Sequence, residues 1–482
     1  MKRTILMAGF AVLLTTSSCG DDFLNTSPTS SIETDKALTT EKDVNNAVNG
    51  LYDLLSTTGY YGGTMFFYGD MKGDDMQSSY NSGRACNQCY RFEHRSNNLN
   101  AGYLWGRPFY IIRNAWNIID AIDRNQVQGD SGRLDALKGE AMAVLALCQF
   151  DLTRCFGYPY TKDQGAGWGA PIVDHPISLD ENPPRSTVAQ DYDFIIRTLE
   201  DAIGRMSDRR NNGRMNRYAA RALLSRVYLY HDEPQKAFQT ASELIREVEQ
   251  NGEYRLYTRD AYISSWDLDQ SFGSESLFEI VNTTDDNGGR NSLAYLMHWN
   301  GYRDIFVTRK FADALLSDPE DVRGQLLEKQ EYQGNEVWWL KKWPGPNPST
   351  PSFYNNYVIF RLSEVYLIAA EAGVKVGGDA ARQGLVYLNR IVQRANPARQ
   401  VTMDEYTLDR VLDERSKELV GEGHRFFDML RNGKTIIRRG GYHLPGIPEE
   451  INWDYTRCVL PIPLDQFTFS PDMEQNPGYT KN

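Results

Sequence analysis

Residues 218–248, YAARALLSRVYLYHDEPQKAFQTASELIREV, carry the pattern that decides the fold. On both sides of the polar residues 231–236, apolar side chains recur three and four residues apart. This is the spacing of one face of an α-helix. The stretch therefore predicts two consecutive helices, over 218–230 and 237–248.

The same stretch partly fits the tetratricopeptide repeat, a helix pair with set small and large residues over 34 positions. The matching residues are Leu224, Ser225, Tyr228, Ala237, Ala241 and Leu244. Arg221 stands where Trp is common, so the match is partial. A second candidate spans 362–391, with Ala369 and Ala381 at the small positions, and looser versions run through 107–157. The pattern favours a tetratricopeptide-like helical superhelix, with an irregular helical bundle as the alternative.

Helical spacing dominates the rest of the chain as well. It predicts helices at 110–127, 134–156, 192–206, 358–374, 380–392 and 408–419, and short strands at 276–282, 336–341 and near 459–462. Long segments rich in Gly, Pro and Asn separate them at 57–104, 157–187, 283–303, 343–356 and 433–457. Loops of that length are usually functional. The predicted fold class is mainly α, with long loop-rich insertions and a few short strands.

The composition is that of an ordinary soluble globular protein, with 41% hydrophobic and 24% charged residues. The net charge of −12 repels phosphate backbones, so nucleic acid is not expected as a partner. The 28 Tyr, 20 Phe and 9 Trp residues supply core filling or flat faces on which a ligand can stack.

The N-terminus has the features of an export signal. Lys2 and Arg3 precede a ten-residue apolar run at 5–14, which is too short to cross a bilayer. Small residues then lead to Cys19, as in bacterial lipoprotein signals whose cysteine is lipidated, although Thr16 stands where Leu or Val is usual. We predict a signal peptide at 1–18, a lipid anchor on Cys19 and a polar tether at 19–34, with simple secretion as the alternative.

Motifs for catalysis or metal binding are mostly missing from the sequence. It contains no Walker, zinc-protease or serine-hydrolase motif, and its six histidines show no zinc-ligand spacing. Asp267, Asp269 and Ser271 resemble the start of a calcium loop, but Gly273 and Glu279 each fall one position late. We therefore expect no catalytic residues, no metal and no cofactor; an enzyme and a calcium loop remain minor alternatives.

Cys86 and Cys89 form the only C-x-x-C of the chain. The single pair does not suit a zinc site of four cysteines, and no strand–helix context of a thioredoxin surrounds it. In an oxidising compartment we predict a local disulfide between them. Cys148 and Cys155 lie about 10 Å apart along one helix and are predicted to be core residues.

Ten short motifs occur in the order in which one family has them. They are CGDDFL (19–24), LW (104–105), YIIRNAWNII (110–119), EAMAV (140–144), FDLTRCFG (150–157), FRLSEVYLIAAEA (360–372), ER (414–415), ELVGEGHRFFDMLR (418–431), LPIP (460–463) and QNPGY (475–479). On these motifs the chain resembles the SusD/RagB-like surface lipoproteins of Bacteroidetes, over nearly its whole length. The motifs at 418–431 and 475–479 are the most specific.

The resemblance implies a lipoprotein on the surface of the outer membrane that covers a SusC-like TonB-dependent transporter and captures oligosaccharides for import. It implies no catalysis. A branch of the family captures peptides, so a peptide-capturing RagB-like protein is the alternative. Residues 35–482 are expected to form one body, with a helical-repeat part at about 35–260 and a SusD/RagB part at about 261–482.

The hallmark motif at 418–431 mixes apolar and charged residues at helical spacing around Gly421 and Gly423. We interpret it as structural, with a helix end held by pairing of Arg425 with Asp428.

Ligand contacts in this family come from variable loops, which here fall in 57–104 and 283–303. Aromatic faces beside amides and guanidinium groups suit a sugar, because its apolar ring face stacks while its hydroxyls need donors and acceptors. The candidates are Tyr80, Arg84, Tyr90, Asn98, Tyr295, Trp299 and Tyr302. For any one of them, the alternative is that it anchors its loop to the scaffold.

Overall fold

The computed structural model of the protein describes residues 37–79, 84–178, 181–345, 354–440 and 443–481. The predicted signal peptide, Cys19, the tether at 19–34 and Tyr80 lie outside the described residues.

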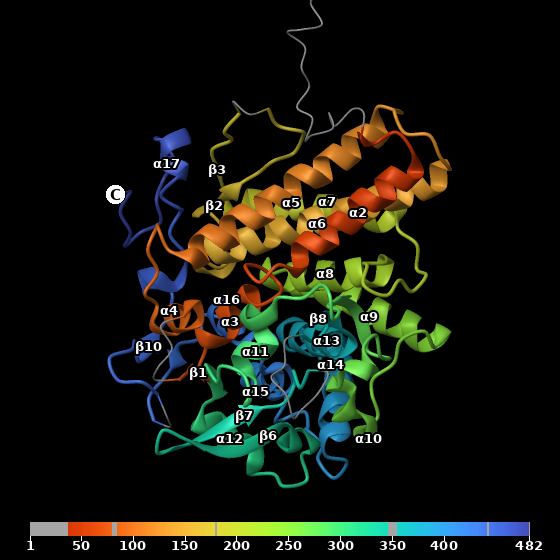
Figure 1. Cartoon of the computed structure of the whole chain (residues 1–482). Coiled ribbons are helices and arrows are strands. Elements are labelled where there is room, and N and C mark those ends of the chain that lie inside the picture. Colours follow the sequence, from red (N-terminus) through yellow and green to blue (C-terminus); the bar gives the residue numbers. More distant parts are fainter. Residues whose placement is uncertain (1–36, 80–83, 179–180, 346–353, 441–442, 482) are drawn as a thin grey trace, which may run out of the picture.

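A series of packed helices forms the scaffold (Figure 1). Its members are α2 (Glu41–Ser56), α5 (Leu99–Asp123), α6 (Ser131–Phe156), α7 (Val188–Arg205), α8 (Arg217–Tyr230), α9 (Pro234–Asn251), α13 (Leu362–Val376) and α14 (Gly378–Ala395). From α5 to α9 each helix packs against the next one in sequence, and α13 then packs against α9 and α14. The two candidate repeats are therefore neighbouring helix pairs, α8–α9 and α13–α14. The predicted tetratricopeptide-like helical fold is confirmed.

Local sequence explains where α7 begins and which face it buries. Thr187 is the N-cap: its hydroxyl accepts a hydrogen bond from Gln190 N, and the Gln190 side chain accepts one from Thr187 N, as in a capping box. The buried side chains Tyr192, Ile195 and Leu199 follow at helical spacing. This apolar stripe packs against α6 and α8.

Residues 252–361 separate α9 from α13 and carry the five strands β4 to β8. Their elements are α10 (Arg259–Tyr262), β4 (Ser276–Ile280), α11 (Leu293–Met297), β5 (Ile305–Val307), α12 (Arg309–Leu316), β6 (Leu327–Tyr332), β7 (Asn335–Leu340) and β8 (Tyr357–Arg361). Strand β8 pairs with β4, so the helix predicted to begin at residue 358 begins at Leu362 instead. The division of the body at about residue 260 stays a prediction.

The segment predicted as a loop at 57–104 contains α3 (Thr64–Met71), β1 (Met76–Ser78) and α4 (Ala85–Arg91). Strand β1 completes a four-stranded sheet in the order β1-β5-β7-β6, in which all neighbours are antiparallel. A smaller pair, β2 (Trp168–Pro171) and β3 (Arg185–Thr187), borders α6 and α7.

The C-terminal segment consists of α15 (Leu408–Leu419), α16 (Arg425–Arg431), β9 (Ile436–Ile437), β10 (Glu450–Ile451) and α17 (Gln466–Phe469). The strand predicted near 459–462 does not form; instead Leu460 N donates a hydrogen bond to Cys155 O, at the end of α6. Elements from both halves of the chain share one hydrophobic core. Within the described part of the chain, no helix has the length and apolar character needed to cross a bilayer.

Candidate functional site

The antiparallel pairing of β1 with β5 brings the two predicted ligand loops together. Ser78 lies opposite Ile305, and Ser79 N donates a hydrogen bond of 2.9 Å to Asp304 O. Residues that follow β1 in sequence therefore lie beside residues that precede β5. This pairing joins segments more than two hundred residues apart.

Arg84 and Tyr302 are in direct contact at this place. The Arg84 guanidinium carbon lies 3.5 Å from the centre of the Tyr302 ring, and Arg84 Nε lies 2.6 Å from Asp304 Oδ2. Tyr295, on α11, packs edge-to-face on Tyr302 with ring centres 4.8 Å apart. Three predicted candidates, Arg84, Tyr295 and Tyr302, are thus brought together, although Tyr295 is 7% exposed and mainly supports its neighbour.

Asp304 is largely buried below Arg84. Burial raises the pKa of Asp304 to about 6, although the neighbouring Arg84 guanidinium acts in the opposite direction. Near neutral pH the carboxylate therefore holds Arg84 over Tyr302, and at mildly acidic pH this hold weakens.

Trp299 contacts a second aromatic ring from another element. Tyr332, at the end of β6, packs edge-to-face on Trp299 with ring centres 6.2 Å apart. The Arg303 guanidinium lies 5.2 Å from the Trp299 ring and 5.5 Å from the Tyr332 ring. Arg303 has a φ of 56°, in the left-handed region that non-glycine residues seldom adopt. Such strain is often found at functional sites.

We call this cluster the aromatic site; it consists of Arg84, Tyr295, Trp299, Tyr302, Arg303, Asp304 and Tyr332. Trp299, Tyr302, Arg303 and Tyr332 are each partly exposed, and Arg84 is exposed. The site thus offers ring faces for stacking and guanidinium groups for hydrogen bonds to a polar ligand.

Three of these residues were missed by the sequence-based prediction. Arg303 lies inside the predicted loop at 283–303 but was not chosen as a candidate, and Asp304 is the first residue after that loop. Tyr332 lies in the polar strand β6, whose residues LEKQEY lack the apolar alternation that marks a half-buried strand.

Two other candidates have structural roles. The Tyr90 ring is fully buried under the Arg438 guanidinium, 4.1 Å away, and its hydroxyl shares a hydrogen bond of 2.8 Å with His443 Nδ1. Asn98 caps α5, because its side-chain oxygen accepts a hydrogen bond from Ala101 N. Neither residue is part of the aromatic site, and their predicted ligand contacts stay predictions.

The predicted disulfide between Cys86 and Cys89 is not found in the structure. Both residues are buried thiols on helix α4. Residues three apart on a helix have Cβ atoms about 5–6 Å apart, whereas a disulfide needs about 3.5–4.5 Å. Cys148 and Cys155 are buried in α6, as predicted for core residues.

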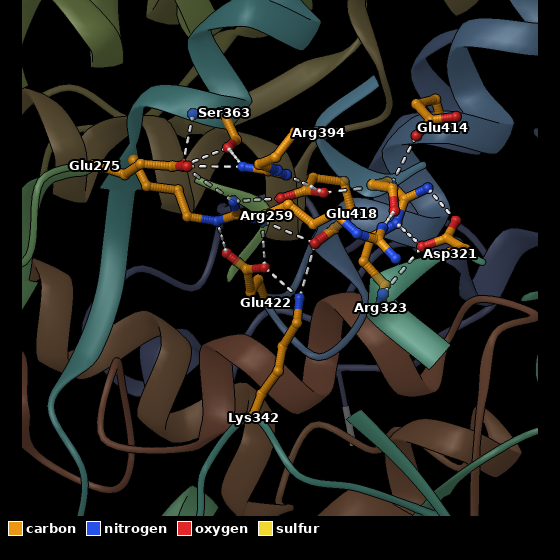
Figure 2. A network of polar contacts seen from close by, with 12 residues as sticks. Arg259, Glu275, Asp321, Arg323, Lys342, Ser363, Arg394, Glu414, Glu418 and Glu422 are labelled. Atoms are coloured by element: carbon orange, nitrogen blue, oxygen red, sulfur yellow. Dashed lines mark hydrogen bonds and ion pairs between the residues drawn. The ribbon is translucent and has the colours of Figure 1, made fainter. Parts of the chain in front are cut away.

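The hallmark motif at 418–431 enters a buried network of ion pairs (Figure 2). Glu418, at the end of α15, lies 2.6 Å from Arg361 Nη1, 2.6 Å from Arg394 Nη2 and 3.3 Å from Arg323 Nη1. Burial alone would raise the pKa of Glu418, but these guanidinium groups outweigh it and hold the pKa well below its usual range.

Glu422 extends this network toward the sheet. Its carboxylate accepts hydrogen bonds from Arg361 Nε at 2.7 Å and Nη2 at 2.8 Å, and Lys342 Nζ lies 2.6 Å away. Arg361 ends β8 and Lys342 follows β7. The network therefore connects strands β7 and β8 to helix α15. The structural interpretation of the motif fits this arrangement.

The predicted pairing of Arg425 with Asp428 is wrong. Arg425 Nε lies 2.7 Å from Asp74, in the segment between α3 and β1. Asp428 instead receives Arg415 at 2.8 Å and Arg431 at 2.7 Å. The motif therefore joins α16 to distant segments, a set of contacts that local spacing does not reveal.

Comparison with known proteins gives consistent matches. Residues 323–479 match the model of the SusD family, and residues 22–229 match a model described as starch-binding associating with outer membrane. A SusD superfamily structure from Bacteroides vulgatus ATCC 8482 is 64% identical, with a TM-score of 0.91, covering 92% of this chain and all of that one. A putative sugar binding protein from the same strain is 37% identical, with a TM-score of 0.85 and coverage of 92% and 100%. The SusD-like protein P25 of Formosa agariphila is 24% identical over 94% of both chains.

Proposed function

Because this chain belongs to the SusD superfamily, we propose that it is an outer-membrane lipoprotein that binds oligosaccharides at the aromatic site and passes them to a SusC-like TonB-dependent transporter. The match to the starch-binding model and the similarity to a putative sugar binding protein support carbohydrate as the ligand class. The protein binds its ligand and does not cleave it.

The observation that carries the ligand assignment is the arrangement of Trp299, Tyr302 and Tyr332. Three partly exposed rings from two segments lie beside two guanidinium groups. A pyranose ring stacks its C–H face on an aromatic ring, and its hydroxyls accept hydrogen bonds from N–H donors. Within the cluster, Arg84 covers one face of Tyr302, so a sugar stacks there only if Arg84 moves aside.

Isothermal calorimetry tests the ligand class. The full chain carrying Cys19→Ala, which is expected to lack the lipid anchor, is titrated with malto-, laminari-, cello-, xylo- and mannohexaose, and separately with a pool of oligopeptides. We expect saturable heat with at least one hexasaccharide and none with the peptides. Saturable heat with peptides alone would favour the peptide-capturing alternative and reject a glycan ligand.

A reducing-end assay on the same mixtures tests whether the protein is an enzyme. Binding without hydrolysis leaves the number of reducing ends constant over hours. An increase that follows protein concentration would contradict the proposal of a binding protein.

A pull-down tests the partner. The tagged protein is solubilised from native outer membranes in mild detergent and purified. We expect a TonB-dependent transporter to copurify with the wild-type protein. The Cys19→Ala variant lacks the lipid anchor, so we expect no transporter to copurify with it. A wild-type preparation without such a transporter would reject this part of the proposal.

A further inference from the structure

A cavity of about 330 Å³ lies between α5, the segment after β2 and the C-terminal segment around α17. It is distant from the aromatic site. In Figure 1, α5, β2 and α17 lie in the upper part of the molecule, whereas α11, β6 and β7 lie in the middle and lower parts. Its volume is within the range of small-ligand pockets, about 300–1,000 Å³.

Hydrogen bonds hold two parts of the cavity wall in place, one just after β2 and one in the C-terminal segment. The segment after β2 is fixed to α5, because Trp116 Nε1 donates a hydrogen bond of 2.8 Å to Val173 O. The C-terminal wall is fixed by Arg185, which donates to Asn476 Oδ1 at 2.9 Å and to Glu474 O at 3.0 Å. These two parts of the wall are therefore positioned before a ligand binds, which lowers the ordering cost of binding.

The motif QNPGY at 475–479 gains a role from this arrangement. Asn476 Nδ2 donates to Leu460 O and Phe156 O, and Gln475 Oε1 accepts from Ile462 N at 2.8 Å. These bonds position the chain just before the motif, where Ser470 and Met473 line the cavity.

The lining combines aromatic faces with polar groups. Trp105 and Phe109 pack with ring centres 5.0 Å apart, and Tyr110 at the rim is 44% exposed. The Arg113 guanidinium lies 5.1 Å from the Tyr110 ring. Asn182 and Gln466, which carry side-chain amides, line the same space.

We propose that this cavity is a second binding site for one sugar ring of an oligosaccharide. The proposal rests on the proposed function, because it assumes that the protein's ligand is a glycan. The exposed face of Tyr110 suits stacking of a pyranose ring, and Arg113, Asn182 and Gln466 supply donors and acceptors for its hydroxyls. Two separate sites let the protein hold one long chain at two places, which increases the overall affinity.

Calorimetry with a matched pair of variants tests this site. Tyr110→Ala removes the stacking face, and Tyr103→Ala removes a tyrosine of similar exposure, 39%, on the same helix but outside the cavity. Both are made in the full chain with Cys19→Ala and titrated with the hexasaccharide that gives the most heat in the panel above. Because Tyr110 is partly exposed, its replacement leaves the melting temperature near that of wild type.

We expect wild type and Tyr103→Ala to bind two hexasaccharides per protein, and Tyr110→Ala to bind one or to bind at the second site about tenfold more weakly. The Trp299→Ala variant is expected to keep binding at the second site only, and the double variant Trp299→Ala/Tyr110→Ala is expected to bind no hexasaccharide. Unchanged stoichiometry and affinity in Tyr110→Ala would overturn the second site and leave the proposed function standing. If no hexasaccharide binds wild type, the proposed function fails as well.

Discussion

Replacing Glu418 by Gln tests whether the buried ion-pair network holds helix α15 to strands β7 and β8. Glu418 is fully buried and its carboxylate contacts Arg361, Arg394 and Arg323. The amide keeps the shape of the side chain but removes the charge, so guanidinium groups in the core lose their counter-ion. Breaking a buried pair in this way costs about 3–5 kcal/mol.

The expected change in melting temperature follows from the size of the protein. Unfolding entropy is about 2.1 cal/mol/K per residue, or about 0.9 kcal/mol/K for a folded body of about 450 residues. A loss of about 3–5 kcal/mol therefore lowers Tm by about 3–5 °C at pH 7. Glu449→Gln is the control, because its pair with Arg439 is exposed on both sides, and it is expected to change stability by less than about 0.5 kcal/mol.

The pH dependence gives an independent check by calorimetric melting. Because the folded protein holds the pKa of Glu418 well below its usual range, the carboxylate stabilises the fold above about pH 4.3, the usual value for Glu. This stabilisation is lost as the pH falls further, so the difference between wild type and Glu418→Gln is expected to shrink below about pH 4. A Glu418→Gln protein that melts within about 1 °C of wild type at pH 7 would refute the reasoning.

Three further predictions concern the cysteines and one buried lysine. Cys19→Ala is expected to move the protein from the membrane fraction to the soluble fraction; membrane retention with unchanged mass would reject the lipid anchor. Unfolded, unreduced Cys19→Ala protein is expected to show five reactive thiols, in line with the structure. A count of three reactive thiols would instead indicate one disulfide, as the sequence predicted for Cys86 and Cys89. Burial lowers the pKa of Lys72 to about 8, so between pH 8 and 10 the folded form has lost a proton that the unfolded chain keeps. Relative to Lys72→Met, wild-type Tm is therefore expected to rise by about 3 °C over this range, and a constant difference would contradict the buried lysine's pKa.

The helices of the scaffold were predictable because each buries one face. Helices α8, α9 and α15 lie within three residues of their predicted bounds, since their apolar stripes have a clear period. Helix α3 was missed because all eight of its residues are buried, which leaves no polar face to reveal the period. Helix α5 begins eleven residues before its predicted start, in a stretch that contains Gly102, Gly106 and Pro108.

The aromatic site was predictable only in part, because its members come together through strand pairing. Trp299 and Tyr302 belong to one loop and could be found by their composition. Arg84 reaches Tyr302 through the pairing of β1 with β5, and Tyr332 reaches Trp299 through the sheet order β5-β7-β6. Neither pairing has a local sequence signal, since register between distant strands depends on the whole fold.

The affinity of Trp299→Ala for the best hexasaccharide of the panel tests the glycan site most directly. Loss of a stacking aromatic at a binding hot spot costs about 2 kcal/mol or more, so we expect at least about a thirtyfold rise in Kd at the aromatic site, with Tm near that of wild type. Trp168→Ala is the control, because Trp168 is a 48% exposed surface ring away from this site and is expected to keep wild-type affinity. Wild-type affinity in Trp299→Ala would contradict a glycan site at this position, and a large fall in Tm beside it would show that Trp299 anchors its loop instead.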